Sequence, residues 1–272
     1  MFANSDNPWT SWRPDVIVFV LLIAAIYALL HRRYAQSGKS VLSASENSNG
    51  NPRSHWIRHT AFFLGLLLLY AAMAPLAQAA QTRLFTVFVV QMLLVTMVLP
   101  WLLIFSLPAA VLMRLLRANW LGALLTWLTR PLVALIFFNA VVTATLIPTV
   151  LNASVTIDWL HGVFENILFL AAVCFWWPLV YPTRAKKFSR GMQLLYLFFA
   201  ANFMMPIIVV LLFSTQPWYA VYNQTPQSPA ASAERMGDQQ LGGVVMLGTM
   251  VAVYGGFGAR LYLRQDESFW YA

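Results

Sequence analysis

Long apolar runs alternate with short polar segments along the chain. Crossing the hydrocarbon core of a bilayer takes roughly 17 to 25 helical residues. Seven apolar runs approach or reach this length, near residues 16–31, 60–76, 84–107, 131–151, 162–181, 192–214 and 242–263. Backbone groups find no water inside lipid, and runs this long suit helices rather than barrel strands. The pattern predicts an all-α, polytopic membrane protein, a seven-transmembrane-helix bundle that forms a single membrane domain over residues 1–272.

Polar segments between the runs indicate where the chain leaves the membrane. Residues 32–59 contain many Ser and Asn residues, which predicts a flexible loop. Residues 214–240 contain three prolines and form a second polar segment. The stretch from Trp120 to Thr129 is apolar but short and ends at Arg130. It therefore suits an interfacial helix or the lead-in to the fourth run.

Basic residues orient the predicted bundle. All but three of the 17 Lys and Arg residues fall in alternate loops, and the exceptions are Arg13, Arg83 and Arg235. Because such residues accumulate on the cytoplasmic side, we expect the N-terminus outside and the C-terminus in the cytoplasm. Residues 32–59 then form a cytoplasmic loop and residues 214–240 an exterior loop.

Composition supports the membrane prediction and limits the partners. Hydrophobic residues make up 60% of the chain and charged residues 10%, with a mean hydropathy of +0.67, which excludes a water-soluble domain. The net charge of +8 is explained by basic loops that face anionic lipid headgroups. We therefore expect the lipid bilayer, and no nucleic acid, as a partner.

Several kinds of chemistry are excluded by the residues available. The chain has no phosphate-binding glycine loop, no HExxH zinc helix and no exposed Ser/His/Asp set, so we predict that it is not an enzyme. A transmembrane haem with two axial histidines needs two histidines within the apolar runs. His31, His55 and His59 lie in or beside the first loop, which leaves only His161. No haem is therefore predicted. A retinal protein needs a lysine within a span, but all three lysines lie in loops.

Five sequence blocks carry a resemblance to a known family. In chain order they read RHTAFFLGLLLLYAAMAPL, LFTVFVVQMLLVTMVLPWLLIFSLP, RPLVALIFFNAVVTATLIP, HGVFENILFLAAVCFWWPLV and DQQLGG. Their order and spacing resemble the caa-type branch of the cytochrome c oxidase assembly factor CtaG family. The resemblance implies a seven-span protein of the bacterial inner membrane that assists copper delivery or insertion into a haem-copper oxidase. The implied partners are oxidase subunits or a copper donor protein.

The chain also departs from the family's pattern. In the third run the pattern has histidines on both sides of Gln91, and here Phe88 and Met92 replace them. A histidine of the fourth run is absent, and the second histidine of the fifth run is Asn166. His161 alone remains. Asp238 matches the family's acidic residue before the last run, and the predicted topology places these positions toward the outer half.

His161 and Glu165 are the first candidates for a metal site, because residues four apart share a helix face. Cys174 lies roughly 20 Å further along the same helix and near its opposite face. Soft Cu(I) accepts thioether ligands, so Met92 is the third candidate, with Met204 and Met205 as further ones. Ordinary packing is the alternative for the methionines, and for Glu165 it is snorkelling or a hydrogen bond to His161.

Other polar and aromatic residues have structural interpretations. Interhelical hydrogen bonds are expected of Gln91, Asn139, Asn166 and Asn202. An inner-interface aromatic belt is expected of Trp176, Trp177 and Tyr181. Pro100 and Pro206 are expected to kink their helices, and neighbouring groups must then satisfy the carbonyls that these prolines free.

Three functions follow as hypotheses. The first is a cytochrome c oxidase assembly factor that handles copper at the outer face. The second is a structural subunit or scaffold of a respiratory oxidase that binds no metal. The third, a small-molecule transporter, has only the helical bundle in its favour.

Overall fold

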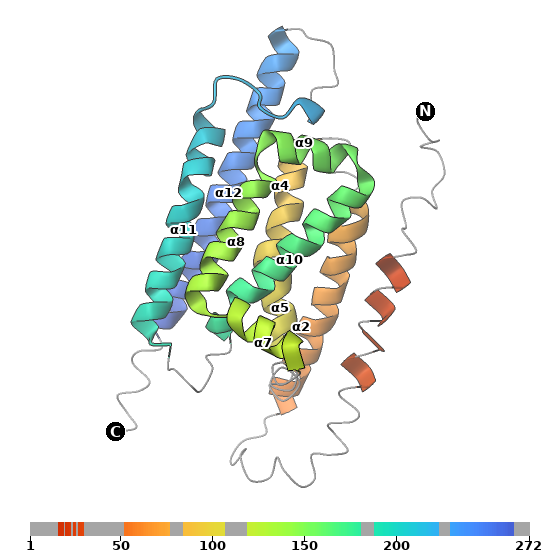
Figure 1. The fold of residues 1–272 in the computed structure, drawn as a ribbon, viewed down its shortest axis with the longest axis vertical. Coiled ribbons are helices and arrows are strands. Elements are labelled where there is room, and N and C mark those ends of the chain that lie inside the picture. The colour runs from red at the N-terminus through yellow and green to blue at the C-terminus, as the bar shows by residue number, and fades with distance from the viewer. Residues whose placement is uncertain are drawn as a thin grey trace.

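The computed structural model describes residues 16–29 except 19, 23 and 26, together with residues 52–76, 84–106, 119–180, 188–222 and 229–263. Every regular element in these ranges is a helix (Figure 1). The α-helices are α2 (Pro52–Ala71), α4 (Phe85–Leu93), α5 (Leu99–Ser106), α7 (Asn119–Leu128), α8 (Pro131–Thr145), α9 (Pro148–Thr156), α10 (Asp158–Val180), α11 (Arg190–Phe213) and α12 (Pro229–Leu263). Short π-helical segments follow α2 at Ala72–Leu76 and join α4 to α5 at Leu94–Val98.

Helices of membrane-spanning length and apolarity are present. Within the described ranges four qualify, Phe85–Ile104, Leu160–Val180, Arg190–Phe213 and Ser232–Leu263. The pair Gly122–Leu128 and Pro131–Thr145, bent by 80°, makes a fifth if it is one broken span. Val16–Leu29 and His59–Ala74 are shorter apolar helices. The all-helical fold is confirmed, while seven spans and the orientation of the termini stay predictions.

The fourth apolar run does not form one continuous helix. The predicted run over residues 131–151 is wrong at its end, because α8 stops at Thr145 and α9 starts at Pro148. Proline has no backbone N–H and disfavours helical geometry in the residue before it. Ile147 is accordingly extended, with ψ at 127°.

The last helix is longer than the seventh apolar run. It begins at Pro229 rather than near residue 242, so its first turns include the second half of the segment 214–240. Small and polar residues make up most of these turns, which hides them from a hydropathy pattern.

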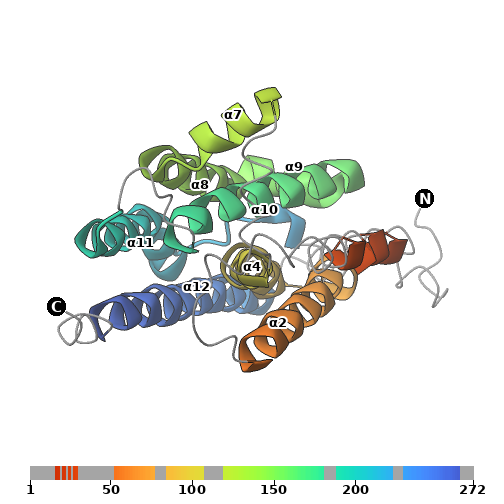
Figure 2. The same ribbon diagram turned by 90° about the horizontal axis from the view of Figure 1, so that it is seen from below.

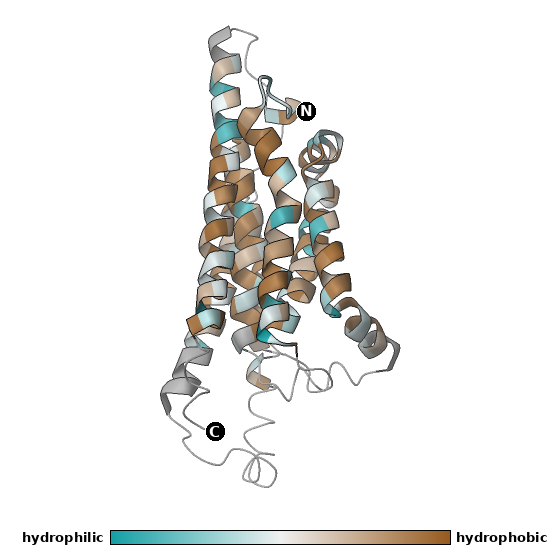
Figure 3. Cartoon of the chain, turned by 90° about the vertical axis from the view of Figure 1, so that its left-hand side faces the viewer, coloured by the Kyte–Doolittle hydropathy of each residue, from teal (hydrophilic) through white to brown (hydrophobic). Residues whose placement is uncertain are grey.

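The third apolar run forms the centre of the bundle. Seen end-on, α4 lies among α2, α10 and α12 (Figure 2), and Val89 on α4 is completely buried. Hydrophobic residues extend along much of each helix (Figure 3), and some of them, such as Phe198 and Phe213, are exposed. A bundle that is apolar inside and outside is typical of a protein surrounded by lipid.

A buried tryptophan donates to a backbone carbonyl in the π-helical segment before Pro100. Pro100 has no N–H to donate to the preceding turn, in which the N–H of Leu99 bonds to the Leu94 carbonyl, five residues back. Trp176 Nε1 donates to the Thr96 carbonyl from α10 at 2.9 Å. The belt prediction is therefore wrong for Trp176, which is completely buried, and Trp177 is buried as well; Tyr181 lies outside the described residues.

Candidate metal site

The first turns of α10 place two of the predicted site residues together. His161 Nε2 lies 3.3 Å from Glu165 Oε1, and the two residues are only 3% and 8% exposed. Glu165 therefore points into the bundle and does not snorkel. The contact is electrostatic rather than a well-directed hydrogen bond, and His161 Nε2 has no hydrogen-bond partner in the described part of the protein.

Gln91 on α4 completes this group of buried polar side chains. Its Nε2 donates to Glu165 Oε1 and, at 3.2 Å, to the carbonyl of Ala72 in the π-helical end of α2. Gln91 thus links three elements, as the sequence predicts for it. We call His161, Glu165 and Gln91 the polar cluster.

The hydrogen bonds between helices that the sequence predicts for three asparagines are not formed by their amide N–H groups. Each asparagine donates to the carbonyl four residues earlier in its own helix, from Asn139 to Leu135, from Asn166 to Gly162 and from Asn202 to Phe198. Satisfying an amide within its own helix needs no neighbour. The amide N–H groups of these three residues therefore do not join helices.

The predicted sulfur ligands lie in different surroundings. Met92 is buried and belongs to the hydrophobic core, which includes Phe88 and Leu168. Met204 is buried and contacts the Tyr254 hydroxyl at 4.0 Å, whereas Met205 is exposed on the outer surface of α11. Cys174 is buried. The structure brings His161 and Glu165 together, and Met92 follows Gln91 on the facing helix.

The polar cluster leaves two buried atoms without hydrogen-bond partners. Besides His161 Nε2, Gln91 Oε1 makes no hydrogen bond among the described residues. Leaving such atoms unpaired costs about 1–3 kcal/mol each, so the cluster offers a nitrogen and two kinds of oxygen to a cation. The described chain has no group of three or more His, Cys, Asp and Glu residues placed to hold a metal. The fit to copper is therefore partial and requires further ligands.

Sequence reasoning gave Gln91 only a structural role and omitted it from the site. The signal was present, because Gln91 is the residue of the third-run motif that this chain retains. The sequence does not reveal how α10 is rotated about its axis, and this rotation is what directs Glu165 toward Gln91.

Asp238 fixes the start of the helix that carries Gln91 and Met92. Its carboxylate accepts from the backbone N–H of Phe85 at 2.7 Å and of Thr86 at 3.2 Å. The Thr86 hydroxyl donates in return to the Asp238 carbonyl at 2.8 Å. Leu84, the residue before α4, supplies no side-chain cap. Asp238, the acidic residue that matches the family's pattern, thus caps the N-terminus of α4 from another helix, α12.

Two glycines after Asp238 allow close packing. A Cβ on Gly242 would lie 2.7 Å from the ring of Phe85 on α4. One on Gly243 would lie 3.1 Å from the side chain of Leu212 on α11. The block DQQLGG therefore packs α12 against both α4 and α11. Because α4 carries Gln91, the block influences the polar cluster by fixing the position of α4.

The segment after α11 closes this end of the bundle. Tyr219 stacks on Phe85 with centroids 4.4 Å apart, and its hydroxyl donates to the Leu146 carbonyl, at the α8–α9 break, at 2.9 Å. Burial raises the pKa of Tyr219 above its usual value, so its hydroxyl remains a donor even in alkaline solution. Gln239 Oε1 accepts from Trp218 N at 2.8 Å. Helices α4, α10 and α12 all begin at this end (Figure 1).

Comparison with known proteins identifies the family. Searches of curated proteins and of solved structures gave no match. The family model described as cytochrome c oxidase caa3 assembly factor (Caa3_CtaG) matches residues 25–264, which is most of the chain and includes the polar cluster, Met92 and Asp238. The chain belongs to the family of cytochrome c oxidase caa3 assembly factors.

Proposed function

We propose that this protein assists copper delivery or insertion into a haem-copper oxidase, as a non-catalytic, multi-pass protein of the bacterial inner membrane. The polar cluster faces the outer side if the N-terminus is outside. The observation that carries the proposal is a pair of buried atoms that make no hydrogen bond among the described residues, His161 Nε2 and Gln91 Oε1, beside the Glu165 carboxylate.

The ligand types suit a metal that is passed on rather than kept. His161 supplies a nitrogen and Glu165 an oxygen, and Met92 offers a thioether to Cu(I) after a side-chain rearrangement. Such a set leaves coordination positions open. A copper donor or an oxidase subunit would fill them during ligand exchange, which a closed four-ligand site would resist.

A second function is favoured by a specific observation. The described residues lack a group of three or more His, Cys, Asp and Glu side chains, and Gln91 already occupies Glu165. A member without metal would act as a scaffold or structural subunit that packs against the oxidase. In that case the polar cluster serves only to join α2, α4 and α10.

Copper stoichiometry under reducing conditions distinguishes these functions. We expect about one Cu(I) per purified chain, with a large loss in His161→Ala and in Met92→Leu. Met205→Leu is the matched control, because Met205 is exposed on the outer face of α11. Binding that is absent from the wild type, or equal in all four proteins, contradicts copper handling.

The oxidase itself provides the second test. A strain without this protein is expected to assemble oxidase with reduced copper content, which added copper partly restores. Co-purification with mature oxidase in a fixed ratio, with copper content unchanged by His161→Ala, favours the structural subunit. A fully metallated, stable oxidase in the deletion strain contradicts both functions.

A further inference from the structure

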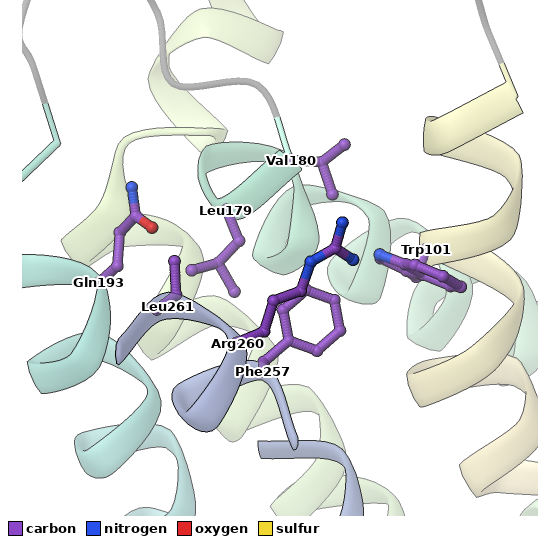
Figure 4. A pocket seen from close by; sticks show the side chains of 7 residues that line it. All are labelled: Trp101, Leu179, Val180, Gln193, Phe257, Arg260 and Leu261. Atoms are coloured by element: carbon purple, nitrogen blue, oxygen red, sulfur yellow. The ribbon is translucent and has the colours of Figure 1, made fainter. Parts of the chain in front are cut away.

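A pocket of about 210 Å³ lies at the end of the bundle opposite the polar cluster, between α5, α10, α11 and α12 (Figure 4). Its walls are aliphatic on α10 and α12, where Val180 and Leu261 line it. Trp101 and Phe257 add an aromatic wall, with their rings edge to face and centroids 5.9 Å apart. We call it the lower pocket, because α12 ends at the lower end of the bundle in Figure 1 and Arg260 lies in its last turn.

Arg260 is the charged residue among the described lining residues. It lies in the last turn of α12 and is exposed, and its guanidinium points toward Trp101 in Figure 4. Gln193, the other polar lining residue, already donates its Nε2 to the Phe188 carbonyl at 2.9 Å. The pocket therefore combines apolar walls with one cation at its edge.

Charges are distributed unevenly between the two ends of the bundle. Arg130 and Arg190, at the starts of α8 and α11, and Arg260, in the last turn of α12, lie at the end of the lower pocket, whereas Arg235 lies near the start of α12 at the other end. The acidic side chains that the structure describes, Glu165, Glu234 and Asp238, lie on the first turns of α10 and α12, at the other end. Among the described residues, no carboxylate pairs with Arg260.

We propose that the lower pocket binds the phosphate of an anionic phospholipid at Arg260, with part of an acyl chain on the apolar walls. A guanidinium offers paired donors that match phosphate oxygens. A helix end with a tryptophan is at the depth of the headgroups, and basic pockets between helices suit anionic lipid headgroups. A free phosphate would make the same contact with Arg260 but leave Val180 and Leu261 unused.

Lipid retention in native mass spectrometry tests the proposal. The full-length protein, in mild detergent, is titrated with phosphatidylglycerol and separately with phosphatidylcholine. We expect retention of about one phosphatidylglycerol, weakened about tenfold by Arg260→Gln, and little retention of phosphatidylcholine. Arg190→Gln is the matched control, since Arg190 is an exposed arginine at the same end that does not line the pocket. Its retention should equal that of the wild type.

A second variant separates the pocket from charge alone. Val180→Phe fills the apolar wall and keeps Arg260, and it should also reduce phosphatidylglycerol retention. Equal loss in Arg190→Gln and Arg260→Gln, equal retention of both lipids, or unchanged retention in Val180→Phe would each overturn the proposal. Displacement of the lipid by millimolar inorganic phosphate would also overturn it, because it indicates a site for phosphate alone. Copper binding should not change in any of these variants.

Discussion

At the scale of single residues, the Asp238 carboxylate caps a helix to which it does not belong. In Asp238→Ala the N–H groups of Phe85 and Thr86 lose their acceptor, and we expect a loss of about 0.5–2 kcal/mol of stability. Thermal unfolding in detergent measures it. Glu234→Ala is the control, because Glu234 is an exposed carboxylate on the same helix. Equal losses in both variants would contradict a capping role.

Trp176 makes a second prediction at this scale. Trp176→Phe leaves the Thr96 carbonyl without its donor, at an expected cost of about 1–3 kcal/mol. Pro100→Ala restores a backbone N–H near that carbonyl, so the double variant should lose less than Trp176→Phe alone. Denaturant unfolding of the set measures the difference. Trp127→Phe, at an exposed position, should be neutral, and an equal loss there refutes the assignment.

The sequence predicted side-chain contacts within one helix better than contacts between helices. The spacing of His161 and Glu165 predicted their contact, because four residues make about one helical turn. Trp176 and the asparagines were misassigned, because their partners depend on how each helix is rotated in the bundle. Aromatic and amide side chains are equally compatible with an interface and with a core, so the residue alone does not decide.

At the scale of helices, Gly242 and Gly248 on α12 give a matched comparison. A Cβ on Gly242 would lie 2.7 Å from the Phe85 ring, whereas one on Gly248 would meet nothing within 4 Å. Gly248→Ala should be neutral or stabilise by about 0.5–1 kcal/mol through helix propensity. Gly242→Ala should destabilise, because the Phe85 ring or the two helices must shift to admit the added Cβ. Melting temperatures that shift equally would contradict close packing at Gly242.

Hydropathy predicted where most helices lie but not where they break. Residues 84–107, 162–181 and 192–214 correspond closely to helical spans. The break at Leu146 and the early start of α12 at Pro229 were not predicted. An average over many residues does not register one proline, and polar turns that continue a helix beyond lipid resemble a loop.

At the scale of the whole molecule, the predicted orientation of the bundle in the membrane can be tested by labelling introduced cysteines. The chain's own single cysteine then sets the background signal. Cys174 is buried and should be silent toward a membrane-impermeant maleimide. Cysteines at exposed positions Thr215 and Arg190 mark the two ends of α11. We expect labelling of Thr215→Cys in intact cells and of Arg190→Cys only after permeabilisation. The reverse pattern would place the polar cluster on the cytoplasmic side.

The cap on α4 also has a consequence in time. Asp238 follows Phe85 by 153 residues, and a ribosome that adds about 5–20 residues per second needs roughly 8–30 s to produce it. The central helix is therefore synthesised well before its first turn can be completed. During that interval the N–H groups of Phe85 and Thr86 depend on water or headgroups, and a chain that stops before α12 would never acquire the finished central helix.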